Sequence, residues 1–325
     1  MKRLTIQNFK SIKQLKLNCK RVNILIGEPN TGKSNILEAI GVLSHICHGQ
    51  ISGFIRFESM SDLFYDHILE NPIRIEFGDK ILRVEFKDGV FSGFFRPQQT
   101  QQFSLIFQYG YDGGTADVRS LENIWRTLLT IKFYRFIKRF YFPNQKSEFL
   151  NPPDGDNLLH VIMTRKELKK ILANIFGKFG YRSVFKPQEG KIDIQKEFED
   201  IIISFPYSLA SETLQRIIFY LTAIYSNKRA VITFEEPEAH AFPYYTKYLA
   251  ERIAMDRNNN QYFIATHNPY FLISILEKTP KNEVATFLTY LEDYQTKVKA
   301  LTETHREEIL EMGTDVFFNI EKFLE

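Results

Sequence analysis

Gly27-Glu28-Pro29-Asn30-Thr31-Gly32-Lys33-Ser34 is the stretch that decides the fold of this chain. It matches the P-loop, in which two glycines, a lysine and a serine or threonine stand at fixed spacing. The apolar residues 21–26 precede it as a strand, and residues 35–43 follow with helical periodicity. The glycines allow a tight turn, so backbone N–H groups and the positive end of the following helix converge on phosphate oxygens. The sequence therefore predicts that these eight residues and Asn35 bind a nucleoside triphosphate together with Mg²⁺.

Two side chains of this loop are predicted to contact phosphate or metal directly. Lys33 is predicted to reach the outer phosphates, and Ser34 to bind Mg²⁺. A glycine-bearing surface turn would explain the same residues without function, but the strand before the loop and the helix after it favour nucleotide binding.

Acidic residues at the end of a second strand are candidates for the Mg²⁺ ligand and for the group that activates water, both of which phosphoryl transfer requires. Residues 230–234 form an apolar strand that runs into Glu235-Glu236-Pro237-Glu238. We expect Glu235 to bind Mg²⁺, directly or through water, and Glu236 to polarise the attacking water. Solvated acids at a strand end are common, but the P-loop upstream favours the catalytic interpretation.

A histidine follows a third strand in the same way. Residues 262–265 end in Thr266-His267-Asn268-Pro269. A lone histidine is usually structural, but one placed after a parallel core strand lies at the edge where such folds bind nucleotide. The predicted catalytic residues are therefore Lys33, Glu236 and His267, and the predicted activity is hydrolysis of the bound nucleoside triphosphate.

Composition sets wider limits. With 325 residues, 44% hydrophobic and 25% charged, the chain is ordinary for a soluble protein and long enough for one large domain or two. Cys19 and Cys47 show no metal-binding spacing and suggest a reducing compartment, so we expect a cytoplasmic protein. No apolar run reaches membrane-spanning length, and no secretion signal is recognisable. The net charge of +3 permits nucleic-acid binding without arguing for it.

The predicted organisation is a single bilobal domain over residues 1–325. Residues 1–110 combine the P-loop unit with short alternating strands joined by hairpins, and residues 115–210 form a helical lobe or insertion. Helical periodicity runs through residues 120–185, with Asn157 as the N-cap of a helix over 158–176. The remainder, residues 211–325, holds a helix over 212–225, the acidic strand, a helix over 244–255, the histidine strand, a hairpin over 284–300 and an amphipathic tail.

The motifs together resemble a known family. Thr5-Ile6-Gln7-Asn8-Phe9-Lys10-Ser11 and the P-loop look like the opening of ABC-type ATPase heads of the RecF/SMC/OLD class. Glu235-Glu236-Pro237-Glu238-Ala239-His240, followed by Pro243, is similar to the Walker B motif and D-loop of that class, and residues 266–269 are similar to its His switch. Residues 150–158 resemble a turn of its compact "AAA-type ATP-binding protein" members. The resemblance implies an α/β P-loop NTPase fold: a bilobal head with a mixed or parallel core sheet, an antiparallel β-subdomain and a helical lobe.

The family also implies a partner. In such heads two ATP molecules are sandwiched in a head-to-tail homodimer, and each P-loop faces the signature motif of the other subunit. The matching stretch is residues 208–216, with Ser211 as the expected contact in trans. It contains no glycine, since Glu212 stands about where one is expected, and Glu235 replaces the usual Asp. The Q-loop glutamine has no clear position, because Gln98, Gln99, Gln101 and Gln102 are equally well explained as a polar surface loop.

Several functions fit these motifs. The leading hypothesis is an ATP-hydrolysing dimeric switch acting in DNA repair or phage defence with a separate effector, such as a nuclease or toxin. The second is a nucleotide-sensing scaffold that hydrolyses slowly or not at all and recruits a partner protein. A small-molecule kinase is disfavoured by the histidine and acidic strand ends. The cluster Lys132, Arg135, Lys138 and Arg139, interleaved with aromatic residues, is consistent with DNA contact, but the solvated face of an amphipathic helix explains it more simply.

Overall fold

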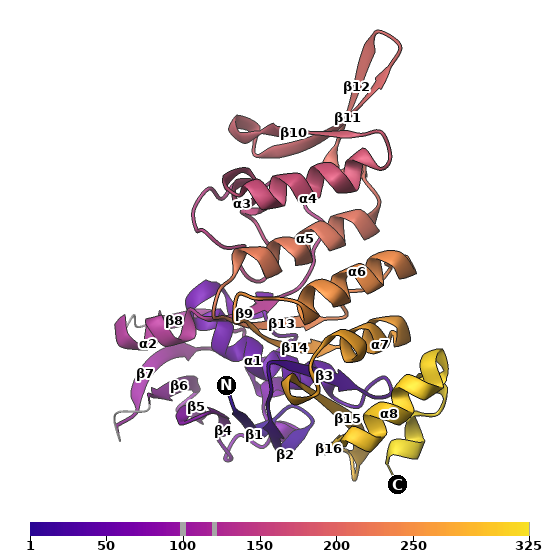
Figure 1. Ribbon diagram of the computed structural model, residues 1–325. Coiled ribbons are helices and arrows are strands. Elements are labelled where there is room, and N and C mark those ends of the chain that lie inside the picture. The colour runs from indigo at the N-terminus through magenta and orange to yellow at the C-terminus, as the bar shows by residue number, and fades with distance from the viewer. Residues whose placement is uncertain (98–101, 119–121, 325) are drawn as a thin grey trace.

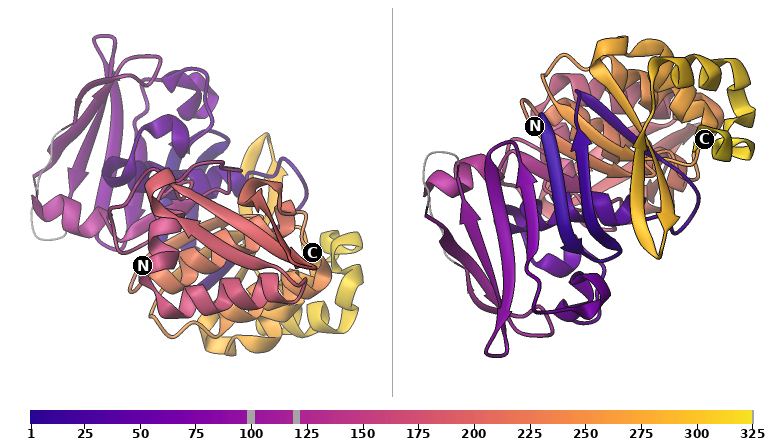
Figure 2. Two further views of the ribbon diagram at one scale, coloured as in Figure 1. Left: turned by 90° about the horizontal axis from the view of Figure 1, so that it is seen from above. Right: turned by 90° about the horizontal axis from the view of Figure 1, so that it is seen from below.

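Three β-sheets organise the chain in the computed structural model, which describes residues 1–97, 102–118 and 122–324. Figure 1 shows a sheet-rich lower part, which holds the N-terminus, and a column of helices rising above it to a projecting hairpin. Seen from above and from below in Figure 2, the antiparallel sheet lies to one side of the parallel sheet and its helices. The lower part contains the elements that carry the P-loop.

The central sheet has the strand order β16-β15-β3-β14-β13-β9. All its strands are parallel except β16, which pairs antiparallel with β15 at the edge. The parallel strands are mainly apolar because both faces of the sheet are covered. Their carboxyl ends meet at one edge, which brings the P-loop, Glu235 and Thr266 together. The strand bounds are β3 Val22–Ile26, β9 Ile131–Tyr134, β13 Val231–Glu235, β14 Gln261–Ala265, β15 Val284–Glu292 and β16 Gln295–Ala300.

A seven-stranded antiparallel sheet forms the second layer, in the order β2-β1-β4-β5-β6-β7-β8. Helix α1 (Lys33–His48) lies between the two sheets, and its apolar residues pack against strands of both in one buried cluster. Helix α2 (Glu122–Leu128) packs beside α1. The strand bounds are β1 Arg3–Phe9, β2 Ile12–Asn18, β4 Ile73–Phe77, β5 Lys80–Lys87, β6 Val90–Arg96, β7 Ser104–Tyr109 and β8 Thr115–Val118.

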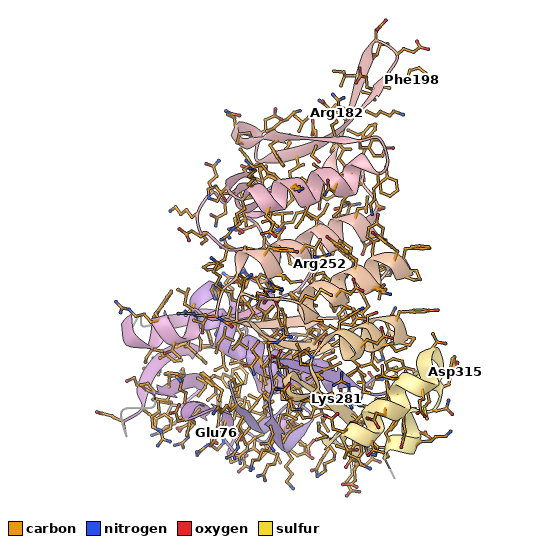
Figure 3. All side chains as sticks on the ribbon, viewed as in Figure 1. Glu76, Arg182, Phe198, Arg252, Lys281 and Asp315 are labelled. Atoms are coloured by element: carbon orange, nitrogen blue, oxygen red, sulfur yellow. The ribbon has the colours of Figure 1, made fainter. Side chains whose placement is uncertain are left out.

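Helices cover the opposite face of the central sheet in a second buried cluster. Above them a three-stranded sheet, β10-β11-β12, ends in the hairpin that projects furthest, where Figure 3 labels Phe198. None of the helices in the described ranges is long and apolar enough to cross a membrane. The bounds are α3 Leu158–Thr164, α4 Lys166–Gly177, β10 Arg182–Lys186, β11 Lys191–Phe198, β12 Ile201–Pro206, α5 Glu212–Ser226, α6 Pro243–Ala254, α7 Pro269–Lys278 and α8 Glu303–Met312.

The helical interpretation of residues 120–185 is wrong in two places. Residues 131–134 form β9, a buried strand of the central sheet, and residues 135–150 contain no helix. Lys132 is buried, and its Nζ donates to Asn227 Oδ1 at 2.5 Å, so it contributes to no basic helix face. The apolar contacts of β9 on both faces of the sheet outweigh its local periodicity.

The predicted helix over 158–176 is also broken. Arg165 is extended, with φ −120° and ψ 115°, and separates α3 from α4. Its guanidinium donates to the carbonyl oxygens of Glu148, at 2.6 Å, and Ser226, at 3.3 Å. Asn157 occupies the predicted N-cap position of α3, but its side chain makes no capping hydrogen bond, because its Oδ1 accepts from Asn151 N at 2.8 Å.

Candidate functional site

The P-loop has a backbone that only glycine fits at two positions. Gly27 has φ 143° and Gly32 has φ 92°, a region that side-chain-bearing residues rarely adopt. A Cβ atom on Gly27 would lie 2.3 Å from Thr289 O, and one on Gly32 would lie 2.0 Å from Thr296 Oγ1. The loop is therefore packed directly against the β15–β16 hairpin and leaves its backbone close to the N-terminus of α1.

Lys33 lies inside this loop. Its buried Nζ donates to the carbonyl oxygens of Gly27, at 2.8 Å, and Glu28, at 2.6 Å. Burial lowers the pKa of Lys33 to about 8, while the charges of Glu236 and Glu28 act in the opposite direction. Thr31 Oγ1 donates to Glu28 O at 2.8 Å and bonds to Thr289 Oγ1 at 2.6 Å, which holds the loop in this shape.

The residues of this loop fit a phosphate chain. Two glycines without Cβ atoms, the first N–H groups of α1 and a buried ammonium are the groups that bind phosphate oxygens in proteins. Ser34, in the first turn of α1, and Glu235 are the residues that would hold Mg²⁺ there. Since the described ranges contain no cluster of three or more His, Cys, Asp or Glu side chains that could hold a metal, phosphate oxygens would complete such a site.

Glu236 and His267 are close to each other and to Lys33. Glu236 has φ 42°, and its N–H donates to Ala265 O at 3.0 Å, which joins the turn after β13 to the end of β14. His267 Nε2 lies 3.5 Å from Glu236 Oε1. Burial and the Lys33 charge lower the pKa of His267, which favours the neutral ring, while the Glu236 charge acts in the opposite direction. The structure thus brings the three predicted catalytic side chains to one edge of the central sheet.

Glu238, the third acid of the run, is a site residue for which sequence reasoning assigned no role. Its side chain is buried and hydrogen-bonded to the hydroxyl of Thr266, the residue before His267. Burial raises the pKa of Glu238 to about 7. Its Oε2 atom is buried without a hydrogen-bond partner. Glu238 therefore ties the acidic loop to the histidine loop.

A second buried acid, Glu38, lies one turn along α1 from Ser34 and was also missed. Lys10 Nζ lies 2.5 Å from its Oε2, and Arg56 Nε lies 2.7 Å from its Oε1. Arg135 Nη2 lies 3.5 Å from Glu38 Oε1. An acid among the apolar residues of a core helix is a signal that could have identified Glu38, although not its partners.

The two arginines of this cluster also reach the predicted metal ligand. Arg135 Nη2 lies 3.4 Å from Glu235 Oε2, and Arg56 Nη2 lies 3.9 Å from Glu235 Oε1. The sequence placed Arg135 on a helix face, but it follows β9 directly, beside β13. Two carboxylates and three cations, Lys10 included, therefore form one charged cluster beside the P-loop.

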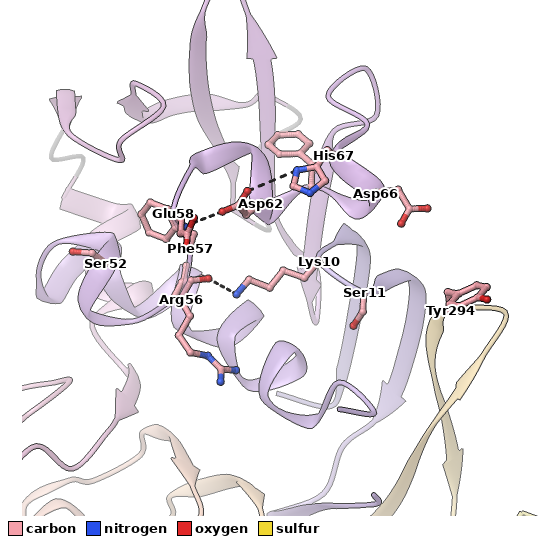
Figure 4. A pocket seen from close by; sticks show the side chains of 12 residues that line it. Lys10, Ser11, Ser52, Arg56, Phe57, Glu58, Asp62, Asp66, His67 and Tyr294 are labelled. Carbon is pink, nitrogen blue, oxygen red and sulfur yellow. Dashed lines mark hydrogen bonds and ion pairs between the residues drawn. The ribbon is translucent and has the colours of Figure 1, made fainter. Parts of the chain in front are cut away.

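A pocket of about 880 Å³ lies beside this charged cluster and shares Lys10 and Arg56 with it (Figure 4). Ser11 connects it to the P-loop, because Asn35 Nδ2 donates to Ser11 Oγ at 2.7 Å. Lys10 Nζ also donates to the Arg56 carbonyl at 2.5 Å across the pocket wall. The volume is within the usual range for small-molecule sites. The lining residues are Lys10, Ser11, Ser52, Ile55, Arg56, Phe57, Glu58, Asp62, Phe64, Asp66, His67 and Tyr294.

Ser211 lies elsewhere in the chain. It is exposed at the N-cap of α5, where its Oγ accepts from Leu214 N at 3.4 Å. Within the described ranges, no hydrogen bond joins Ser211 to the P-loop of the same chain. Thr213 Oγ1 donates to His240 O at 2.6 Å, which ties the start of α5 to the loop after the acidic run.

The structure describes one of the four glutamines considered for the Q-loop. Gln98, Gln99 and Gln101 lie outside the described residues. Gln102 precedes β7 in the antiparallel sheet. Among the described residues, the cationic side chains placed against Glu235 are Arg56 and Arg135.

Comparison with known proteins gives two kinds of match. Residues 22–274 match a family described as "AAA domain, putative AbiEii toxin, Type IV TA system". The fold is similar to the crystal structure of an Smc head bound to the C-winged helix domain of ScpA, with TM-score 0.56 and 16% identity, covering 94% of this chain and 99% of that one. It is also similar to an Smc head domain with an extended coiled coil, bound to the C-terminal domain of ScpA derived from Pyrococcus furiosus. There the TM-score is 0.53 and the identity 15%, covering 95% and 98%. No curated protein matches the chain.

Proposed function

The chain belongs to this AAA domain family and has the fold of an ABC-type ATPase head of the SMC/RecF class, and on that premise we propose that it is an ATP-hydrolysing switch. In this switch, bound nucleotide joins two copies head to tail, and hydrolysis separates them. The observation that carries the proposal is the convergence of Lys33, Glu236 and His267 at one edge of the central sheet.

Each of these residues has a defined part in the proposed reaction. Lys33 exchanges its two carbonyl partners for oxygens of the outer phosphates. Glu236 orients and polarises the water that attacks the terminal phosphorus. The neutral His267 ring hydrogen-bonds the terminal phosphate. Mg²⁺ held by Ser34 and Glu235 supplies neutralisation of charge on the phosphate oxygens.

The position of Ser211 supports a second copy as the partner. Ser211 contributes nothing to the P-loop of its own chain, yet it begins a helix whose first N–H groups are available to an anion. Large apolar side chains surround it on the surface: Leu209, Phe242 and Tyr244 are 71%, 68% and 53% exposed. A second copy would cover this apolar surface and receive Ser211 at its own P-loop.

We place the switch in DNA repair or phage defence, where it would act through a separate effector such as a nuclease or toxin. The two Smc heads to which the fold is similar are each bound to a domain of ScpA. An ATPase head that controls a partner protein is therefore physically reasonable for this chain.

A slowly hydrolysing scaffold is the second candidate. It is favoured by the two arginines that approach Glu235, because they compete with Mg²⁺ for the same carboxylate. Glu212 at the start of α5 also places a negative charge near the surface proposed to receive the partner's phosphates.

Light scattering and measurement of phosphate release distinguish the hydrolysing switch from the slowly hydrolysing scaffold. The Glu236→Gln variant should bind Mg-ATP and accumulate at twice the mass of the chain, while Lys33→Ala should stay monomeric. A wild-type protein that releases phosphate no faster than Lys33→Ala, yet dimerises with ATP, is the scaffold. A Glu236→Gln variant that stays monomeric with ATP contradicts the switch.

A further inference from the structure

Tyr294 occupies the tip of the β15–β16 hairpin and packs against almost nothing. Its side chain is 94% exposed. Asp293 and Tyr294 have φ 49° and 59°, so both turn residues are left-handed. Asn and Gly are the residues that ordinarily occupy such a turn. A tyrosine in this conformation, with its ring in water, has no evident role in holding the fold.

The turn is nevertheless fixed relative to the P-loop. Thr296 N donates to Ser11 O at 2.9 Å, and Thr296 Oγ1 bonds to Ser11 Oγ at 2.6 Å. The same Ser11 Oγ accepts from Asn35 on the first turn of α1. On the far side, the Gln295 side chain interacts with the Tyr65 hydroxyl. These contacts hold the hairpin tip in one position beside the phosphate site.

That position is the rim of the 880 Å³ pocket. Figure 4 shows Tyr294 at one side of it, next to Ser11, with His67 and Asp66 across the opening. The lining also includes Phe57, which is partly exposed, and Ile55 and Phe64, which are almost fully buried. The pocket therefore combines the exposed Tyr294 ring and a partly exposed aromatic ring with polar side chains, which are groups that a nucleoside can contact.

The expected direction of the bound nucleotide also places its nucleoside end at this pocket. The outer phosphates belong at the Lys33, Glu236 and His267 end of the P-loop. Asn35, two residues beyond Lys33, is already joined to Ser11 at the pocket. A nucleotide whose phosphates lie along the P-loop thus carries its nucleoside end toward Tyr294.

We propose that Tyr294 is a stacking platform for the nucleobase, so that the β15–β16 hairpin recognises the base while the P-loop recognises the phosphates. This inference rests on the proposed ATP binding and extends it to a residue that determines affinity for the base. The hairpin also packs on Gly27 and Gly32 through Thr289 and Thr296, so base and phosphate recognition share one rigid element.

Calorimetric titration with two ligands tests the proposal. ATP and inorganic tripolyphosphate, each with Mg²⁺, are titrated into wild type, Tyr294→Ala and Tyr294→Phe. Stacking on an aromatic ring supports about a tenfold gain in affinity. We expect Tyr294→Ala to bind ATP about tenfold more weakly and tripolyphosphate unchanged, and Tyr294→Phe to bind both as wild type does.

Other outcomes overturn the proposal. If Tyr294→Ala binds ATP as tightly as wild type does, Tyr294 does not stack on the nucleobase. This also holds if the variant fails to dimerise, because Tyr294 is then a contact between copies. An equal loss of affinity for ATP and tripolyphosphate in Tyr294→Ala also overturns the proposal, because the substitution then acts on the P-loop. Lys33→Ala is the separate control: wild type that binds neither ligand better than Lys33→Ala contradicts the proposed function itself. Tyr294→Asn, which suits the left-handed turn, should fold at least as stably and bind ATP like Tyr294→Ala.

Discussion

Arg135 Nη2 lies 3.4 Å from Oε2 of Glu235, the carboxylate that ends β13 and is proposed to bind Mg²⁺. The same nitrogen is 3.5 Å from Glu38, so one guanidinium bridges two acids on different elements. Arg135 N also donates to Pro153 O at 2.8 Å, which connects this point to the segment leading into α3. Binding of a divalent cation at Glu235 would therefore compete with an ion pair between the ends of β9 and β13.

Replacing Arg135 tests this competition. Arg135→Gln removes a positive charge beside Glu235, so the Mg²⁺ concentration that half-saturates ATP binding should fall about fivefold. Titration of Mg²⁺ at fixed ATP measures it. Arg139→Gln is the matched control, because Arg139 pairs with Asp154 and not with the cluster. An unchanged or increased Mg²⁺ requirement in Arg135→Gln contradicts the competition.

Glu38 should dominate the stability of the charged cluster. Glu38→Gln leaves Lys10, Arg56 and Arg135 without the fully buried carboxylate that they share. We expect a loss of about 3–5 kcal/mol in the free energy of unfolding, measured by urea denaturation. Glu212→Gln, which breaks an exposed pair with Arg216 on α5, should cost less than about 1 kcal/mol. Equal losses of unfolding free energy in the two variants would show that the buried cluster stabilises the fold no more than an exposed ion pair does.

Lys33 predicts a pH dependence of nucleotide binding. Its pKa of about 8 means that the ammonium loses its proton as pH rises through 8, whereas adjacent phosphate oxygens raise that pKa in the complex. ATP binding should therefore take up a proton above pH 8 and weaken by about threefold to tenfold between pH 7.5 and 9. Calorimetry in two buffers of different ionisation enthalpy measures the proton uptake. Affinity that stays constant over this range, or falls equally in Lys33→Ala, refutes the assignment.

Glu238 predicts a pH dependence of stability, because burial raises the pKa of this carboxyl. Its folded-state pKa, about 7, is above the ordinary value of 4.5, so the unfolded chain releases the proton first as pH rises. Stability is therefore lost between about pH 4.5 and 7 on account of this group. Glu238→Gln removes the ionisable group and should raise the free energy of unfolding at pH 8 by up to roughly 3 kcal/mol. A Gln variant that is less stable than wild type at pH 8 would contradict this.

The meeting of the motif-bearing strand ends could be predicted from the sequence because each short motif ends a buried strand. Apolar residues identify β3, β13 and β14, and in a parallel sheet their carboxyl ends must meet, which brings Lys33, Glu236 and His267 together. β14 spans residues 261–265 and so contains the strand that the sequence predicted over residues 262–265. Local pattern was sufficient there because strand and motif are contiguous in the chain.

The errors and omissions came from contacts between distant residues. Lys132 resembles a surface lysine, but its partner Asn227 is 95 positions away and allows it to be buried in β9. Glu38 meets Lys10 and Arg135, which no local pattern connects to it. The link from Thr296 to Ser11 spans 285 positions, so the placement of Tyr294 at the pocket could not be read from the sequence.

Mixing two defective chains tests the central claim most directly. Lys33→Ala and Ser211→Glu are each placed in a Glu236→Gln background, labelled differently, and measured by light scattering with Mg-ATP. If each site takes Lys33 from one copy and Ser211 from the other, each variant alone stays at 38.3 kDa, while the mixture forms dimers that carry both labels and one intact site. A mixture that remains monomeric, or a Ser211→Glu chain that dimerises alone with ATP, would contradict the account.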